Sequence, residues 1–327
     1  MRAVVQDEYG GPEVLSVAED VEKPAVTGET DVLVRVRAGG MDQSVWHLMT
    51  GSPAPARLMF GLRRPKTRVR GWDVAGHVEE VGPAVTRFKP GDAVFGTSTA
   101  GSFADYTVTT EDLLAPAPAN LDLAHAAALP VSGQTALQVL RDAAGLRAGQ
   151  RVLVIGAGGG VGSFAVQVAK VDGAEVTGVC STSKVGFVRS LGADDVVDYT
   201  QEDVTARDET WDVIADIAGH RPLDRLRRVL APKGTLVFVG AEVPGVLGGM
   251  GRQLRAQALG PFVGQSFKAP FARTKVTDLE TLRDLVEAGK ITPAVTATYP
   301  LSETPQAIRD MRAAKIHGKA VILVEEA

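Results

Sequence analysis

The sequence predicts an α/β protein with a β-rich region, then a doubly wound parallel sheet, then a shorter mixed region. Before about residue 120, short runs alternate apolar and polar residues and are separated by Gly and Pro, as in strands joined by turns. After about Leu121, short apolar runs alternate with helix-length segments, which favours a parallel sheet covered by helices on both faces. A glycine-rich turn also joins one buried run directly to a helix.

In the first region, Asp31–Arg37 and Val74–Val81 predict strands because their apolar residues alternate with polar ones. Phe88–Phe95 predicts a Pro-Gly-Asp turn that leads into a further strand. The Ala- and Leu-rich segments Ala124–Leu129 and Thr135–Ala144 predict the first helices.

The alternating region follows, and the last stretch returns to a mixed pattern. The strands expected in the parallel sheet are Arg151–Ile155, Glu175–Cys180, Asp194–Asp198, Trp211–Ile217 and Thr235–Val239, with helices at Val161–Val171 and Lys184–Leu191. At the end of the chain we expect a strand at Ala294–Tyr299, a helix from about Ser302 and a strand at Ala320–Val324.

Composition limits the classes of function. The chain has 327 residues, 45% hydrophobic and 23% charged, which suggests about two domains. A net charge of −4 gives no global basic field for nucleic acid or an anionic membrane. The single cysteine, Cys180, excludes a disulfide framework and a cysteine-rich zinc lobe. No apolar stretch reaches the roughly 18 residues that span a bilayer. We expect no signal peptide and a cytoplasmic location.

The strongest motif is Arg151–Lys170, in which an apolar strand runs into Gly156–Gly162 and then into an apolar-faced helix. Glycines permit a tight turn and a close approach to a pyrophosphate, which the helix N-terminus then attracts. With a second strand about 20 residues later, the pattern predicts a Rossmann dinucleotide site. The residues expected to contact the cofactor here are Gly159, Gly160, Val161, Gly162 and, after a later strand, Gly240.

The end of the second strand indicates NADPH as the cofactor. An NAD site usually has an acidic side chain there, whereas Val179–Lys184 (VCSTSK) has none. Hydroxyl groups and a lysine suit a 2′-phosphate, so we expect Ser181, Thr182 and Lys184 to bind it. Lys184 could alternatively be an ordinary surface residue of the following helix.

A basic segment extends from Arg57 to Arg70 with six cations and no acidic residue. It is either a solvated loop or a lid over the active site that meets an anionic substrate or the cofactor phosphate. A nucleic-acid patch is disfavoured, because Phe60 is its only aromatic residue for base stacking.

Six phrases together resemble the medium-chain dehydrogenase/reductase superfamily, specifically its zinc-free quinone oxidoreductase-like branch. They are Gly71–Gly82, Phe88–Gly96, Ala127–Leu140, Ala144–Lys170, Cys180–Thr200 and His317–Ile322, in the family's order along nearly the whole chain.

The resemblance implies a GroES-like catalytic domain made of residues 1–122 and 291–327, with a Rossmann NADP-binding domain, residues 123–290, inserted between them. It also implies that Lys184 and Tyr199 flank the 2′-phosphate and that Thr135 lies near the nicotinamide. It implies a homodimer joined through the Rossmann sheets, where Gly234–Gly240 is the apolar strand nearest the edge.

The same resemblance excludes a catalytic zinc ion. At the places where zinc-binding members carry ligands, this chain has Asp42, Trp72 with Asp73, and Val131. Tryptophan and valine do not bind zinc, and one stray carboxylate cannot fill three ligand positions.

Three residues are candidates for the proton step. His47 and Ser44 fall where alcohol dehydrogenases keep a proton-relay histidine and hydroxyl, although His47 could instead be a satisfied or surface histidine. Asp42 stands where most zinc-free relatives have asparagine, and an ionised aspartate cannot donate a hydrogen bond to a substrate carbonyl. The proton is expected from His47, from Asp42 if it is protonated, or from water.

Without a metal, the favoured substrates are acceptors that are already activated, namely quinones or α,β-unsaturated carbonyl compounds. The sequence does not separate quinone from enone. Two alternatives stay open: a metal-free NADP-dependent alcohol dehydrogenase or ketone reductase that uses Ser44 and His47, and a non-catalytic NADPH-binding sensor.

Overall fold

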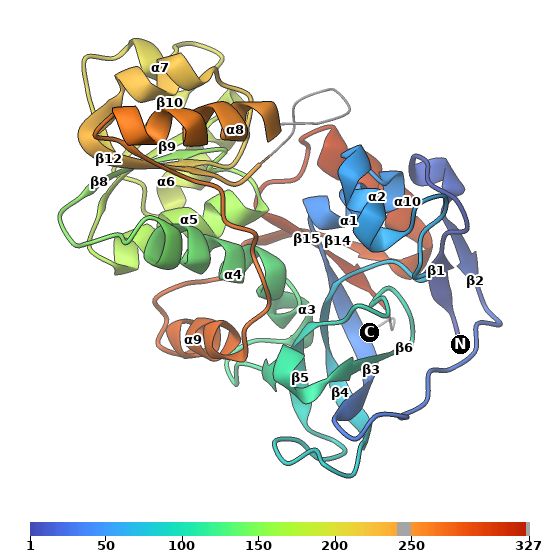
Figure 1. Cartoon of the computed structure of the whole chain (residues 1–327). Helices are drawn as coiled ribbons and strands as arrows, with labels where there is room; N and C mark the ends of the chain where they lie inside the picture. Colours follow the sequence, from blue (N-terminus) through green and yellow to red (C-terminus); the bar gives the residue numbers. More distant parts are fainter. Residues whose placement is uncertain (241–249, 325–327) are drawn as a thin grey trace. The chain divides into compact units, whose positions relative to one another are not determined.

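In a computed structural model that describes residues 1–240 and 250–324, the chain forms two compact units (Figure 1). Unit 1 consists of Met1–Gln134 and Arg273–Ala327, and unit 2 is Thr135–Ala272. Unit 2 is therefore inserted in the chain of unit 1. The boundaries differ from those expected at residues 122 and 290, because residues 123–134 and 273–290 lie in unit 1.

A single helix accounts for the later boundary. Helix α9 (Val276–Glu287) packs on unit 1, where Asn120 Nδ2 donates to the Val286 carbonyl at 3.0 Å and the Ala119 amide donates to Glu287 Oε1 at 2.9 Å. The Leu282 side chain packs closely on Gly133, since a Cβ added to Gly133 would lie 2.8 Å from Leu282 Cδ1. These contacts join α9 to unit 1, although its sequence pattern continues that of the preceding helices.

The main sheet of unit 1 has the strand order β14-β15-β3-β4-β5-β7 in the described residues, with β6 also paired to β3. All of these pairs are antiparallel except β14 with β15. The strands are β3 (Asp31–Met41), β4 (Asp73–Val81), β5 (Ala93–Thr97), β6 (Tyr106–Thr110), β7 (Leu114–Pro116), β14 (Val295–Pro300) and β15 (Lys319–Leu323). A separate antiparallel pair joins β1 (Ala3–Val5) to β2 (Ser16–Ala18).

The alternation seen in the sequence explains the core of unit 1. In β3, the side chains of Val32, Val34 and Val36 are fully buried in the main cluster, while Arg35 between them is exposed. Burying three valines stabilises the fold by roughly 1.5–3 kcal/mol each. The other helices of the unit are α1 (Gln43–Thr50), α2 (Arg57–Phe60), α3 (Leu123–Ala126), α4 (Pro130–Leu137), whose last residues belong to unit 2, and α10 (Thr304–Arg312).

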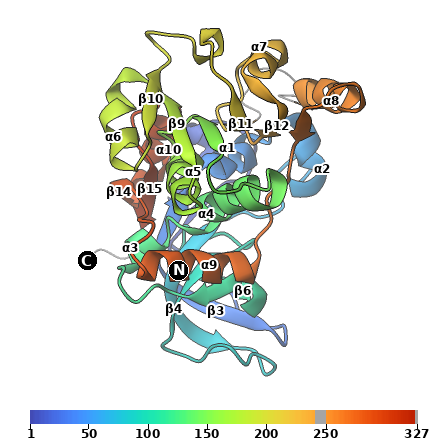
Figure 2. The ribbon, with the colours of Figure 1, turned by 90° about the vertical axis from the view of Figure 1, so that its left-hand side faces the viewer.

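Unit 2 is the doubly wound sheet that the sequence predicts. Its described strands are all parallel and lie in the order β10-β9-β8-β11-β12-β13. Figure 2 labels β10, β9, β11 and β12 of this sheet in its upper part. Their bounds are β8 (Arg151–Ile155), β9 (Glu175–Cys180), β10 (Asp195–Asp198), β11 (Trp211–Asp216), β12 (Leu230–Phe238) and β13 (Ser266–Lys268). The helices are α5 (Gly160–Val171), α6 (Val185–Ser190), α7 (Leu223–Arg228) and α8 (Met250–Leu259), with a π-helical turn at Gln138–Ala143. In Figure 1, α5 covers one face of the sheet, and α7 and α8 cover the other.

One detail of this sheet differs from expectation. Strand β12, which covers most of Gly234–Gly240, is followed in the sheet by β13, which pairs with it through Thr235, Leu236 and Val237. Thus Ser266–Lys268 forms the edge. The strand was missed because three residues are too few to give a period-2 pattern.

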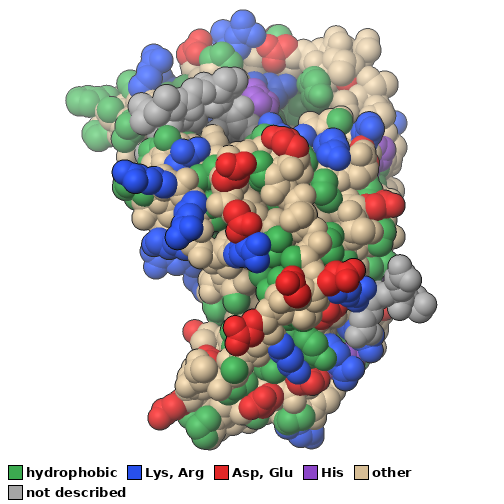
Figure 3. Space-filling view, turned by 90° about the vertical axis from the view of Figure 1, so that its right-hand side faces the viewer, with side chains coloured by type: hydrophobic (Ala, Val, Ile, Leu, Met, Phe, Trp, Pro, Cys, Tyr) green, Lys and Arg blue, Asp and Glu red, His purple; other side chains and the backbone are tan. Residues whose placement is uncertain are grey.

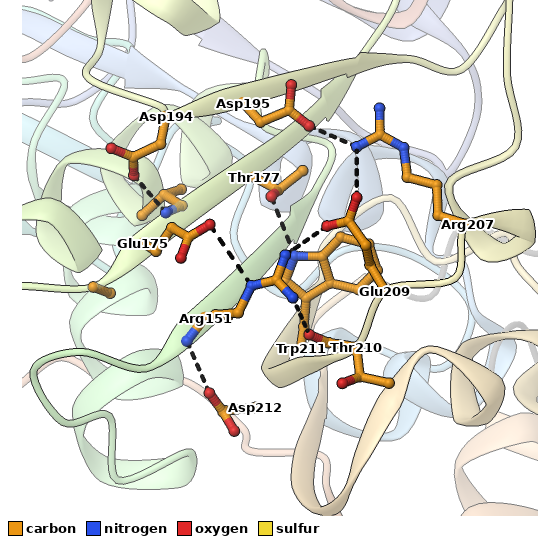
Figure 4. A network of polar contacts seen from close by, with 12 residues as sticks. Arg151, Glu175, Thr177, Asp194, Asp195, Arg207, Glu209, Thr210, Trp211 and Asp212 are labelled. Carbon is orange, nitrogen blue, oxygen red and sulfur yellow. Dashed lines mark hydrogen bonds and ion pairs between the residues drawn. The ribbon is translucent and has the colours of Figure 1, made fainter.

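At the amino ends of the central strands, Arg151 organises a polar network (Figure 4). Its guanidinium contacts Glu209 Oε2 at 2.5 Å, Glu175 Oε1 at 3.7 Å and the Thr210 carbonyl at 2.9 Å. Behind it, the buried indole of Trp211 donates to Thr177 Oγ1 at 3.1 Å. These contacts tie β8, β9 and β11 together at the end opposite the glycine-rich turn. None of the helices in the described residues is long and apolar enough to cross a bilayer.

Candidate functional site

The glycine-rich turn lies at the carboxyl end of β8 and opens helix α5. Gly156 has a φ of +93°, and the amides of Gly156 and Ala157 both donate to the Val179 carbonyl at 3.0 Å. A Cβ on Gly162 would meet the Gly156 carbonyl oxygen at 2.1 Å, so only glycine lets α5 begin this close to the turn. Of the predicted residues, Gly159 is the N-cap and Gly160, Val161 and Gly162 lie in the first turn of a 12-residue helix, whose amides suit a pyrophosphate.

The predicted phosphate-binding residues follow β9. Lys184 is only 8% exposed; its stem packs on Gly158, and its ammonium donates to the Gly158 carbonyl at 3.4 Å. The Ser181 hydroxyl lies 3.4 Å from that of Ser183. Tyr199 is 55% exposed at the end of β10. The structure therefore brings Lys184 to the glycine-rich turn and leaves Tyr199 on the surface.

An acidic residue that the sequence analysis missed stands beside these hydroxyls. Asp198 accepts from Thr182 Oγ1 at 2.6 Å, and from the amide and hydroxyl of Thr200 at 3.0 and 2.8 Å. The hydrogen bond from Thr182 lowers the pKa of Asp198. Asp198 pairs in register with Cys180, so the neighbouring strand β10 brings a carboxylate to the end of β9 that β9 itself lacks.

Two further predicted cofactor residues lie in unit 2. Gly240 follows β12, where its amide donates to the Asp216 carbonyl at 3.3 Å and a Cβ would meet the Ile217 carbonyl oxygen at 2.0 Å. Thr135 lies in α4 and is 8% exposed. Gly240 thus stands at the carboxyl edge of the sheet, beside the turn that follows β11.

A buried ion pair also lies at this edge. Asp216, the last residue of β11, is fully buried, and Arg252 Nη1 lies 2.7 Å from its Oδ2. The other carboxylate oxygen accepts from the Gly219 amide at 3.1 Å. Burial raises the pKa of Asp216. The pair fixes the turn after β11 and was not predicted, although an aspartate that ends an apolar strand (WDVIAD) is a signal for it.

In unit 1, Asp42 and Ser44 are brought together where β3 ends and α1 begins. Asp42 caps α1: its Oδ1 accepts from the Ser44 amide at 2.7 Å and from the Ser44 hydroxyl at 2.5 Å. His47 lies three residues further along α1, so it shares a face with Ser44. Its Nδ1 is 2.7 Å from the Ser52 carbonyl, which can only accept, so Nδ1 carries a proton in this contact.

Behind Asp42, three charges share the ends of three neighbouring strands. The Lys319 ammonium, fully buried at the start of β15, lies 3.3 Å from Asp73 Oδ2 and 3.8 Å from Asp42 Oδ2, and donates to Ser132 Oγ at 3.1 Å. Asp73 also accepts from the Val131 amide at 2.9 Å. Burial raises the pKa of Asp73, against the lowering effect of Lys319. We call Asp42, Asp73 and Lys319 the buried charge cluster.

Sequence reasoning missed Lys319, although a lysine at the start of an apolar strand (KAVIL) was a signal for it. The buried charge cluster shows whether the residues at the expected ligand positions could bind a catalytic zinc ion. The two carboxylates at the expected ligand positions already face an ammonium cation, Val131 contributes only its backbone, and Trp72 has no metal-binding atom. Among the residues that the structure describes, no group of three or more His, Cys, Asp or Glu could hold a metal ion. The residues present do not fit a catalytic zinc ion.

Comparisons with known proteins cover almost the whole chain. The family model of the alcohol dehydrogenase GroES-like domain matches residues 28–119, and that of the zinc-binding dehydrogenase matches residues 191–322. The mitochondrial NAD(P)H oxidoreductase RTN4IP1 of Bos taurus is 31% identical over 99% of this chain and 89% of its own length. The chloroplastic NADPH-dependent alkenal/one oxidoreductase of Arabidopsis thaliana is 33% identical over 98% and 79%.

Among solved structures, the quinone oxidoreductase from Coxiella burnetii superposes with a TM-score of 0.85, at 26% identity, over 99% of both chains.

Proposed function

The chain belongs to the medium-chain dehydrogenase/reductase superfamily, in its quinone oxidoreductase-like branch, and from this premise we propose that it is a zinc-independent, NADPH-dependent oxidoreductase. Its substrate is an activated acceptor, a quinone or an α,β-unsaturated carbonyl compound, reduced by hydride transfer. The observation that carries this proposal is the buried charge cluster, where an ammonium cation rather than a metal neutralises Asp42 and Asp73.

The cluster limits the substrates because it offers no Lewis acid. The Lys319 ammonium is held by Asp73, Asp42 and Ser132, so it is engaged in the protein interior. A simple ketone needs strong polarisation of its carbonyl before it accepts hydride, whereas a quinone or an enone is already electrophilic. The alkenal/one oxidoreductase among the relatives supports this substrate class.

Bound NADPH supplies the hydride. The start of α5, with Gly159, Gly160, Val161 and Gly162, would hold its pyrophosphate, because the amides of a helix N-terminus attract phosphate and glycine at 162 lets the helix begin close to the turn. The remaining residues assigned to the cofactor in this proposal are Thr135, Ser181, Thr182, Lys184, Tyr199 and Gly240.

Reduction of an enone also requires a proton at the carbon next to the carbonyl. Asp42 accepts the Ser44 hydrogen and lies near the Lys319 ammonium, so we assign it to holding Ser44 and not to donating the proton. We assign the donor role to protonated His47, whose orientation is fixed by its bond to Ser52. Ser44 is the hydroxyl that Asp42 holds in place beside it.

The test is a steady-state screen of NADPH oxidation with a quinone, an enone and a simple ketone, before and after overnight chelation. We expect turnover with the quinone or the enone, none with the ketone, no loss on chelation and well under one zinc per chain. Turnover of the ketone would favour an alcohol dehydrogenase or ketone reductase. Tight NADPH binding without oxidation by any acceptor would favour a sensor.

A further inference from the structure

Unit 1 contains a cavity of about 200 Å³ beneath the basic segment. Its apolar walls include Leu48 of α1, Met59, Phe60 and Trp72, and its cations are Lys66 and Arg70; none of the described residues that line it is acidic. Phe60 and Trp72 meet edge to face, with ring centroids 6.3 Å apart and an interplanar angle of 88°. Such a cavity holds roughly one aromatic ring, since a cavity of about 150 Å³ takes up benzene.

Arg70 is the unusual member of this lining. Its side chain is 4% exposed, yet it forms no ion pair within the described residues. One terminal nitrogen donates to the Thr67 carbonyl, and the buried Nε has no hydrogen-bond partner. Burial lowers the pKa of Arg70 to about 10, so it remains charged at neutral pH. Burying a cation without a counter-ion costs free energy, and buried cations in proteins are therefore normally paired with an anion.

The other cations of the basic segment have ordinary explanations. Arg68 pairs with Asp7 at 2.7 Å, and Arg57 donates to the carbonyls of Gly51 and Thr50. Arg63, Arg64 and Lys66 are exposed and solvated. On the face in Figure 3, Lys and Arg side chains gather along one edge, as expected for a solvated basic surface. Arg70 differs from such residues because it is buried and faces a cavity.

Two lining residues are also sequence neighbours of residues assigned to the proposed active site or its charge cluster. Trp72 directly precedes Asp73 of the buried charge cluster, and Leu48 directly follows His47 on α1. We propose that this cavity binds the carboxylate end of the substrate, which is therefore an activated carbonyl acceptor that also carries an acidic group. Arg70 is its counter-ion, and Phe60 and Trp72 pack on the apolar part between the two ends. The inference rests on the proposed function, because that function supplies the carbonyl acceptor.

A pair of probes tests the carboxylate: 4-(3-oxobut-1-enyl)benzoate and its methyl ester, in which a neutral methoxy group replaces the charged oxygen. Binding of each to the full-length protein with NADP⁺ is measured by isothermal titration calorimetry. We expect the wild type to bind the acid at least tenfold more tightly than the ester. Arg70→Met should remove this preference, because it keeps the apolar stem and removes the charge. Arg63→Met, an exposed control in the same segment, should preserve it.

Equal binding of acid and ester by the wild type would overturn the inference without any variant. Loss of the preference in Arg63→Met as well would also overturn it, because general surface charge would then be responsible. Since Arg70→Met also loses the bond to Thr67, circular dichroism checks its fold, and Arg70→Lys, which keeps the charge, should retain part of the preference.

Turnover separates the two proposals. If the acid binds preferentially through Arg70 but neither probe oxidises NADPH, the proposed function fails and the site stands. If both probes are reduced by NADPH and both bind with equal affinity, the proposed function stands and the proposed carboxylate site fails.

Discussion

Lys184 and Asp198 place opposite charges near the hydroxyls at the carboxyl ends of β9 and β10. The ammonium of Lys184 reaches the Gly158 carbonyl, while Asp198 holds Thr182 and Thr200. A 2′-phosphate would be attracted by the first and repelled by the second. The balance between these two residues, and not the absence of an acid from β9, is therefore expected to set the choice between NADPH and NADH.

Lys184→Ala should raise the Michaelis constant for NADPH at least several-fold, because a lost charge-assisted contact costs roughly 1.5–3 kcal/mol. The constant for NADH should stay nearly unchanged. Asp198→Asn, the opposite change of charge, should strengthen the preference for NADPH. Steady-state kinetics with both cofactors measure this. Equal losses for both cofactors in Lys184→Ala would mean that Lys184 only supports the glycine-rich turn.

His47→Ala tests the proton step. General acid catalysis by one positioned group is worth about 10²–10⁴ in rate, so the turnover number with an enone should fall at least tenfold. A quinone should be affected much less, because its reduced oxygens collect protons from water. The affinity for NADPH should be preserved. Unchanged turnover with both acceptors, in a folded variant, would assign the proton to water.

Among the elements, β3, β4 and β15 are joined by side chains as well as by backbone. Asp42 follows β3, Asp73 begins β4 and Lys319 begins β15, and the strands are neighbours in the sheet. The lysine is the central member, since its ammonium approaches both carboxylates.

Lys319→Met should lower the free energy of unfolding by about 3–5 kcal/mol, because it leaves buried carboxylates unpaired. Without the ammonium, the pKa of Asp73 rises further above its unfolded value. The stability of the variant is then retained at low pH, where Asp73 is protonated, and is lost as the pH rises through the folded-state pKa of Asp73. The loss of unfolding free energy relative to the wild type should therefore be larger at pH 8 than at pH 6. Urea unfolding at both pH values measures it. Adding Asp73→Asn should reduce the pH dependence, and an equal deficit at both values would argue against this account.

Sequence patterns were most informative where the structure depends on residues that are close together in the chain. The apolar run Arg151–Ile155 and the glycines after it could be recognised because strand, turn and helix are local. Asp198 and Lys319 were missed because each acts across strands that are distant in sequence: Asp198 through its register with Cys180, and Lys319 through β3 and β4. The contacts of helix α9 could not be predicted for the same reason, since its partners are Asn120 and Gly133.

For the whole molecule, the exposed edge of the parallel sheet is the feature that bears on association with a second chain. The outer side of β13 carries backbone groups without a partner strand in the described residues, which is a template for pairing with another chain. We predict a homodimer joined along Ser266–Lys268. Light scattering at micromolar concentration should give twice the mass of one chain. A strict monomer over that range would contradict the prediction.

The insertion of unit 2 has a consequence for the order in which the protein is completed during synthesis. β3 and β4 emerge early from the ribosome, but their partner β15 comes only at Lys319–Leu323, after all of unit 2. Unit 2 is continuous in the chain, so it can fold while the sheet of unit 1 still lacks an edge. The ammonium that neutralises Asp42 and Asp73 is thus among the last groups to arrive. A chain truncated before Lys319 would contain the intact glycine-rich turn of unit 2 but an incomplete sheet in unit 1.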